Sequence, residues 1–311
     1  MSVAYNKAIL YTELKQSGVI SAGDMTQVTD SLKQNGLAVV RNFLPSDKIR
    51  KIRRAAEISC DTGYGIGGGY TLDPSQNEKM HEFRHPYLTS PEAVEYVTSE
   101  NLLRPIDALL GERAIIHHAV YQISLPSQER VLDFHIDSGS FKSINGRKKF
   151  SDLRIRTILY LSDVKNGGFS YILNSHDAAL RTFLPLPTGE LFPQSEVPRG
   201  DPERIVTIHE PAGTIIFFNT HGLHRPELLD EKRVVLNTWF CRNDFLGKLP
   251  AMLFSAAAIP TAQKHRIHIF ENERNCPIEE YSHSFAYKGW RKYLRSLVAA
   301  LKFEKPAKGY E

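Results

Sequence analysis

Two side chains with metal-binding chemistry stand two positions apart within residues 130–139. They are His135 and Asp137, and the apolar residues Phe134 and Ile136 alternate with them, which indicates a β-strand of period 2. In a strand, residues i and i+2 project from the same side, so the imidazole and the carboxylate are expected to point together. A second histidine would complete the 2-His-1-carboxylate face that holds Fe(II) while leaving positions open for substrate and dioxygen.

Candidates for the second histidine lie at the end of an apolar run, residues 213–225, which we interpret as a buried strand. His221 and His224 have an odd offset, so in an extended chain they face opposite ways and only one reaches an interior metal. We choose His224. Arg233 follows it by nine positions, and a planar guanidinium suits a carboxylate, which indicates an anionic co-substrate.

The composition is that of a soluble globular protein, because 41% of the 311 residues are hydrophobic and a large core is possible. The formal charge of +4 is concentrated in residues 286–311, which hold seven Lys or Arg against two Glu. We interpret that segment as a solvated helix face, so no nucleic acid and no membrane partner is expected. Three separated cysteines without a CxxC pair, no signal-peptide pattern and no long apolar run predict a cytoplasmic protein.

Helical patterns precede residue 112 and β-type runs follow it. Helices are expected from Asp24 to Gly36, from Ser46, and from Ser90 to Gly111, the last one renewed near Ser99. Short strands are expected at 37–40, 113–125, 130–136, 153–162, 169–174, 205–209, 214–219 and 233–241. Many short strands punctuated by turns, without intervening helices, predict a mainly β protein with flanking helices, built as an antiparallel sandwich or barrel.

The predicted domain organisation is one domain over residues 1–311. Its parts are N-terminal helices and a first strand at 1–112, a β core at 113–241 with an insertion at 181–204, and a C-terminal helical extension at 242–311. Within the first part, residues 1–20 are expected to form a surface helix and 79–84 a loop over the site. Gly63, Gly65 and Gly68 formally satisfy GxGxxG, but no strand precedes them, so we interpret them as a flexible loop.

Four blocks, in order along residues 36–241, resemble the phytanoyl-CoA dioxygenase-like family of Fe(II)/2-oxoglutarate-dependent oxygenases. They are the opening strand at 35–44, the His135-x-Asp137 motif, the segment 166–176, and the block from Gly213 through His224 to Arg233. The resemblance implies a double-stranded β-helix (a jelly-roll, cupin-like core) with helices packed outside it.

The resemblance also implies a ligand set. Fe(II) would bind to His135, Asp137 and His224, and 2-oxoglutarate would chelate it with its far carboxylate on Arg233. Thr157 is expected to add a hydrogen bond to the co-substrate, and Gln122 to line the pocket as a further cofactor contact. The distal loop of this chain is shorter than the family's, so Arg225 stays open as an alternative anchor.

The resemblance implies hydroxylation of an aliphatic C–H with O2, releasing succinate and CO2. Halogenating relatives leave a small residue at the carboxylate position, so Asp137 favours hydroxylation. We expect a small-molecule substrate, such as an amino acid or a secondary-metabolite intermediate. Desaturation, epoxidation, ring closure, an acyl-CoA substrate and a non-catalytic metal-binding barrel stay open as alternatives, and the oligomeric state is not predicted.

Overall fold

The fold is known from a computed structural model that describes residues 11–13, 22–62, 80–127, 134–135, 137, 154–176, 204–242, 253–270 and 276–277. Three predicted features lie outside the described residues: the glycine-rich loop around Gly65, the insertion at 181–204 except for its last residue, and the basic C-terminal helix.

The helices of the described chain are α1 Ala22–Asn35, α2 Ser46–Thr62, α3 Pro86–Thr89, α4 Pro91–Val97 and α5 Glu100–Leu110. Their ends follow local signals in the sequence. Gly36 takes a left-handed φ of 76° after α1, and Gly111 does the same with a φ of 75° after α5. Ser90 caps α4 by accepting a hydrogen bond from the Ala93 N–H at 3.1 Å. The predicted boundaries at Gly36, Ser90 and Gly111 are thereby confirmed, whereas α1 begins at Ala22, two residues before the predicted start at Asp24.

A seven-stranded sheet carries the main part of the fold, in the order β1-β2-β8-β5-β10-β4-β3. Its strands are β1 Tyr11–Glu13, β2 Leu37–Arg41, β3 Met80–Phe83, β4 Ile115–Ser124, β5 Arg154–Tyr160, β8 Ile215–Asn219 and β10 Arg233–Cys241. The β1–β2 pair is parallel and every other neighbouring pair is antiparallel. β10 lies between β5 and β4, so each of its side chains has cross-strand neighbours on both of these strands.

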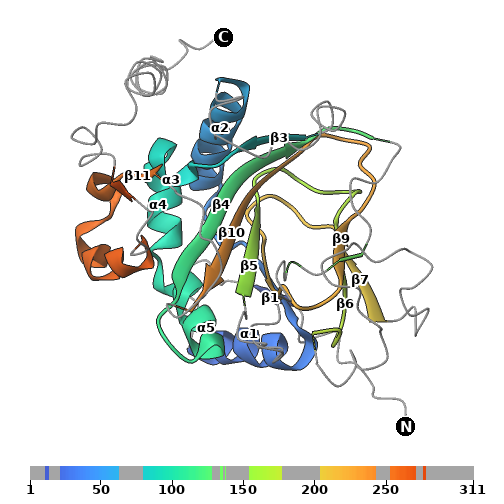
Figure 1. The fold of residues 1–311 in the computed structure, drawn as a ribbon. Helices are drawn as coiled ribbons and strands as arrows, with labels where there is room; N and C mark the ends of the chain where they lie inside the picture. Colours follow the sequence, from blue (N-terminus) through green and yellow to red (C-terminus); the bar gives the residue numbers. More distant parts are fainter. Residues whose placement is uncertain are drawn as a thin grey trace, which may run out of the picture.

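A second, three-stranded antiparallel sheet has the order β7-β6-β9. Its strands are β6 Phe169–Ile172, β7 Ile205–Ile208 and β9 His224–Pro226. Helices α2 to α5 lie on one side of the large sheet and the small sheet lies on the other (Figure 1). Beyond β10 the described elements are β11 Leu253–Phe254, the 3₁₀ helices η3 Ala256–Ala258 and η4 Thr261–Phe270, and β12 Cys276–Pro277.

The core has two layers that share the large sheet. Alternating residues of its strands belong to different layers, as the period of 2 requires. On β8, Phe217 packs in the cluster that includes the helices, whereas Phe218 packs against β6 residues such as Phe169 and Tyr171. Two facing sheets with helices outside confirm the predicted antiparallel sandwich.

Three local predictions are wrong. Residues 11–13 form strand β1 and not part of a surface helix, and 80–83 form the edge strand β3 and not a loop. The run 213–225 is also not one strand. β8 ends at Asn219, a turn follows, and His224 begins β9 in the other sheet. Across the ranges that the structure describes, no helix has the length and apolar character needed to span a bilayer.

Candidate metal centre

Backbone hydrogen bonds bring the two candidate metal-binding segments together. His135 and His224 form an antiparallel bridge, and each N–H donates to the other's carbonyl at 3.0 Å. The Asp137 N–H donates to the Thr220 carbonyl just beyond β8, also at 3.0 Å. Main-chain pairing therefore brings together two segments that are far apart in the sequence. It fixes the backbone positions from which the three side chains project.

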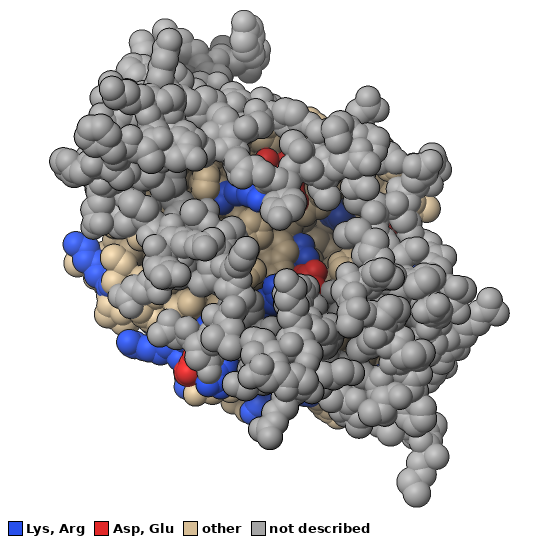
Figure 2. Space-filling view, viewed as in Figure 1, with Lys and Arg blue, Asp and Glu red and all other residues tan. Residues whose placement is uncertain are grey.

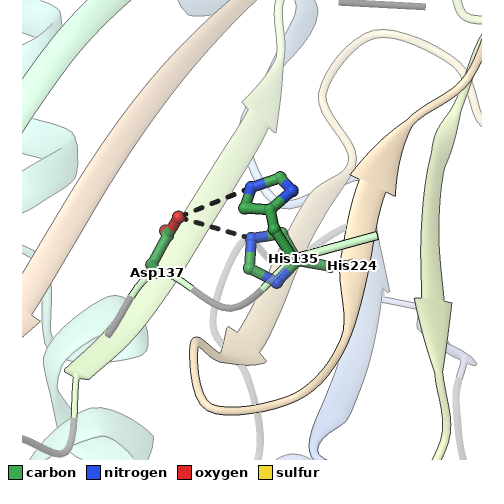
Figure 3. Close-up of side chains that lie close together, drawn as sticks. All are labelled: His135, Asp137 and His224. Carbon is green, nitrogen blue, oxygen red and sulfur yellow. Dashed lines mark ion pairs between the residues drawn. The ribbon is translucent and has the colours of Figure 1, made fainter. Parts of the chain in front are cut away.

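The three side chains converge on one point (Figure 3). Oδ1 of Asp137 lies 3.7 Å from Nε2 of His135 and 3.6 Å from Nε2 of His224. One ligand atom from each residue lies within 4.8 Å of the other two. Metal bonds of about 2 Å from each donor span such separations, so this group has the geometry to hold a single ion.

His224 has the hydrogen bonding of a metal ligand. It is 1% exposed, and its Nδ1–H donates to the Gly222 carbonyl at 2.8 Å. That bond leaves Nε2 with a lone pair, and this buried atom has no hydrogen-bond partner among the described residues. A metal-bound histidine typically donates its other ring N–H in this way. The orphaned Nε2 therefore fits a metal ion.

Two residues that the sequence reasoning missed orient the Asp137 carboxylate. Its Oδ2 accepts hydrogen bonds from Nε1 of Trp239 at 2.9 Å and from Nη1 of Arg156 at 3.2 Å. Burial raises the pKa of Asp137, but Arg156 and then His224 outweigh it, so the net pKa lies well below its usual value. The group is therefore ionised, with Oδ1 directed at the histidines.

Arg156 and Trp239 also contact each other, because the guanidinium carbon of Arg156 lies 3.9 Å from the centroid of the Trp239 ring. They are direct neighbours across β5 and β10. A polar residue alternating with apolar ones on strand 154–160 was the available signal for Arg156. Nothing in the sequence indicates that Trp239 stands beside it, because register between distant strands is not local information.

Arg233 is a second cation of the site, besides Arg156. It is 7% exposed, and its Nη1 donates to the Gly167 carbonyl at 2.5 Å. Its Nε has no hydrogen-bond partner, and no carboxylate among the described residues pairs with it. Burial lowers its pKa. A desolvated guanidinium with free donor capacity favours an anionic ligand.

The alternative anchor, Arg225, is already engaged. Its Nε donates to Oε1 of Glu227 at 2.8 Å, and its guanidinium carbon lies 4.1 Å from the centroid of the Phe134 ring. It does not line the cavity that contains Arg233. The geometry therefore favours Arg233 over Arg225.

The structure does not bring Thr157 to the site. Arg156 and Ile158 face the cavity, so Thr157 between them points to the opposite face of β5. There it is fully buried, with its Oγ1 3.3 Å from the Tyr96 hydroxyl. Thr157 is therefore not in position to donate a hydrogen bond to a co-substrate in the cavity, and that prediction is wrong.

Gln122 does line the cavity. Its Oε1 accepts a hydrogen bond from Nδ2 of Asn237 at 2.8 Å, and its Nε2 donates to Oγ of Ser124 at 3.2 Å. These bonds span β10 and β4 and fix the amide. The side chain is in place for a contact with a bound molecule.

A cavity of about 260 Å³ joins these groups. The candidate ligands, Arg156, Arg233 and Gln122 all line it, together with apolar residues such as Ile158, Phe169 and Val235. Figure 2 shows the hollowed face, where Lys or Arg and Asp or Glu side chains lie among uncharged ones. The site is therefore a concave pocket with a few polar groups on an apolar lining, as is usual for small ligands.

Two facing β-sheets that enclose a His-Asp-His group are the arrangement of a non-haem iron oxygenase with a 2-His-1-carboxylate site. Residues 32–227 match the family model Phytanoyl-CoA dioxygenase (PhyH), and the chain belongs to that family. It is accordingly an Fe(II)- and 2-oxoglutarate-dependent oxygenase with a jelly-roll core, using O2 as oxidant. No curated protein sequence matches it.

Solved structures share the fold at low sequence identity. HygX from Streptomyces hygroscopicus, with nickel, 2-oxoglutarate and hygromycin B bound, has a TM-score of 0.52 and 15% identity, covering 73% of this chain and 90% of its own. The carbocyclase SnoK from nogalamycin biosynthesis has a TM-score of 0.53 and 17% identity, covering 71% and 83%. The epimerase SnoN from nogalamycin biosynthesis has a TM-score of 0.50 and 14% identity, covering 71% and 84%. These likenesses concern the fold.

Proposed function

We propose that this oxygenase hydroxylates an aliphatic C–H of a small molecule and converts 2-oxoglutarate to succinate and CO2. The observation that carries the proposal is that His135, Asp137, His224 and the buried Arg233 line one cavity. The first three supply the donor set that suits Fe(II), and the fourth supplies a cation for a dicarboxylate.

In this proposal His135, Asp137 and His224 hold the iron. His224 is presented as a neutral ligand by its bond to Gly222, and Asp137 by its bonds to Trp239 and Arg156. Bound Fe(II) supplies the activation of dioxygen that side chains cannot perform. The protein keeps the donors in one orientation, so little rearrangement accompanies metal binding.

Arg233 binds the far carboxylate of 2-oxoglutarate in this proposal. Its pairing to Gly167 holds the guanidinium in one position, and apolar neighbours such as Val235 and Ile158 exclude water around the carbon chain. Gln122, held by Asn237, is the proposed further contact. The co-substrate is thus oriented at both ends before the substrate binds.

A small-molecule substrate is supported by the cavity, which at about 260 Å³ suits a compact ligand rather than a polymer. HygX has hygromycin B bound, which is consistent with such a substrate class. The carbocyclase and epimerase among the similar structures favour a second candidate, in which the same site closes a ring or inverts a centre instead of hydroxylating.

Succinate release tests the proposal. Purified protein supplied with Fe(II), 2-oxoglutarate and a metabolite extract should form succinate, and product masses should show one added oxygen. Asp137→Ala should abolish succinate formation, because the proposed metal site would lose the carboxylate of its ligand set. Asp30→Ala, on the exposed surface of α1, is the matched control and should keep full activity. Full activity in Asp137→Ala would end the proposal, and loss of two hydrogens without added oxygen would favour ring closure or desaturation.

A further inference from the structure

A carboxylate enters the same cavity from the edge of the large sheet. Met80 and Glu82 of β3, together with Arg84 just after it, line the cavity, whereas Phe83 faces the core shared with the helices. Glu82 stands opposite Gln122 of β4 in the register, and Gln122 stands opposite Val235 of β10. With strands about 4.8 Å apart, Glu82 starts about 10 Å from the strand that carries Arg233 and Trp239.

Glu82 differs from the other acidic residues of the cavity because nothing described pairs with it. Asp137 is held by Arg156 and Trp239, and Glu227 is held by Arg225. The Glu82 carboxylate makes no hydrogen bond or ion pair with any residue that the structure describes. A carboxylate inside a pocket without an internal partner has acceptor capacity for a ligand.

The neighbouring groups do not neutralise Glu82. Burial raises its pKa, and the charges of Arg84 and Arg156 only partly oppose that effect. Arg156 is committed to Asp137, and Arg84 has an interaction of its own. Gln122, its cross-strand neighbour, bonds to Asn237 and Ser124. An ionised Glu82 is therefore costly to the fold, and residues that are costly to the fold are concentrated at functional sites.

We propose that Glu82 binds a protonated amine of the substrate, which makes the substrate class an aliphatic amine. This inference rests on the proposed function, since it assigns the substrate end of the same cavity. Arg233 serves the anionic co-substrate at one strand, and Glu82 serves a cationic substrate two strands away. The separation of the opposite charges prevents either ligand from taking the other's place. An acyl-CoA, which is strongly anionic, does not fit this assignment.

Binding to the nickel-loaded protein with 2-oxoglutarate tests the inference without turnover. The probes are matched pairs, each with a single amine: glucosamine and N-acetylglucosamine, and cyclohexylamine and N-cyclohexylacetamide. Calorimetric titration should show at least one amine binding about tenfold or more tightly than its acetylated partner, since acetylation removes the charge. Glu82→Gln should abolish that preference. Glu95→Gln, on α4 and paired with Lys48, is the matched control and should retain it.

The possible outcomes separate this inference from the proposed function. Equal affinity within every pair, no binding of any amine, or a preference that survives in Glu82→Gln would overturn the amine assignment. Succinate formation by the iron-loaded wild-type protein is measured separately. Its absence would defeat the proposed function while leaving the amine preference measurable on the nickel-loaded protein.

Discussion

The indole N–H of Trp239 donates to Oδ2 of Asp137 at 2.9 Å, while Oδ1 of the same carboxylate faces Nε2 of His135 and of His224. The two oxygens therefore have different roles. One is held by the large sheet, and the other is directed at the metal position. A carboxylate fixed in this way would bind a metal through Oδ1 alone, because Oδ2 is engaged by Trp239 and Arg156.

Trp239→Phe should weaken metal binding without unfolding the protein. The phenyl ring of the variant should keep the place of the indole against Arg156 and His118. The hydrogen bond that sets the rotation of the Asp137 carboxylate is lost. Loss of such a supporting bond typically lowers metal affinity by about 10- to 100-fold. Calorimetric titration with Co(II) measures the affinity, and thermal melting of the metal-free protein checks the fold. Unchanged affinity would mean that Arg156 alone holds the carboxylate.

Arg233→Met should weaken 2-oxoglutarate binding by about 30-fold or more, because truncating one partner of a buried charge pair costs at least about 2 kcal/mol. Arg233→Lys should recover part of the loss, since it restores the charge without the planar fork. Titration of 2-oxoglutarate into the nickel-loaded variants measures both effects.

Arg225→Met is the comparison for the Arg233 variants. Its side chain is paired with Glu227 and does not line the cavity, so 2-oxoglutarate affinity should stay within about threefold of wild type. If Arg225→Met showed the large loss and Arg233→Met did not, the assignment of the anchor would be reversed.

The sequence predicted best what depends on local chemistry. Ser90, Gly36 and Gly111 mark helix boundaries through a side-chain cap or a left-handed φ, and both signals act within a few residues. The prediction that His135, Asp137 and His224 lie together agrees with the geometry. The argument for choosing His224 over His221 does not agree with it. It assumed an extended chain, whereas a turn carries His224 into the other sheet.

Features that depend on register or on distant pairing were not predictable in this way. Thr157 was assigned to the site although its neighbours Arg156 and Ile158 face the cavity, and a shift of one residue reverses the face of a strand. The edge strand β3, which carries Glu82, has too short a pattern to stand out from a loop. Its position is fixed by pairing with β4.

Glu82→Gln should stabilise the ligand-free protein at neutral pH. The folded-state pKa of Glu82 is raised above its ordinary value of 4.5. Below that value Glu82 is protonated and its burial carries no charge penalty, so its contribution to stability is fully present. That contribution is lost as the pH rises through the folded-state pKa and the buried carboxylate ionises. The variant should melt at a higher temperature than wild type at about pH 7.5, and the difference should shrink at about pH 4. Melting curves of Glu95→Gln at both pH values control for the substitution itself, and a wild type that is the more stable at neutral pH would contradict the expectation.

Gly222→Ala should lower both stability and metal affinity. A Cβ at this position would lie 1.8 Å from the hydroxyl oxygen of Tyr171, which is fully buried and donates to the Asn219 carbonyl. Relief of that overlap must move the turn, at a cost of about 1–3 kcal/mol. The Gly222 carbonyl also holds Nδ1 of His224, so metal affinity should fall by about tenfold or more.

Gly111→Ala separates the two effects of the Gly222 variant. Gly111 has a φ of 75° and no atom within 4 Å of a Cβ, so alanine there should cost about 1–2 kcal/mol of backbone strain. Because Gly111 ends α5, far along the chain from the His224 turn, metal affinity should be unchanged. Denaturant unfolding measures the stability of both variants, and Co(II) titration measures their affinity. A Gly222→Ala protein that is destabilised but binds metal like the wild type would show that the turn does not position His224.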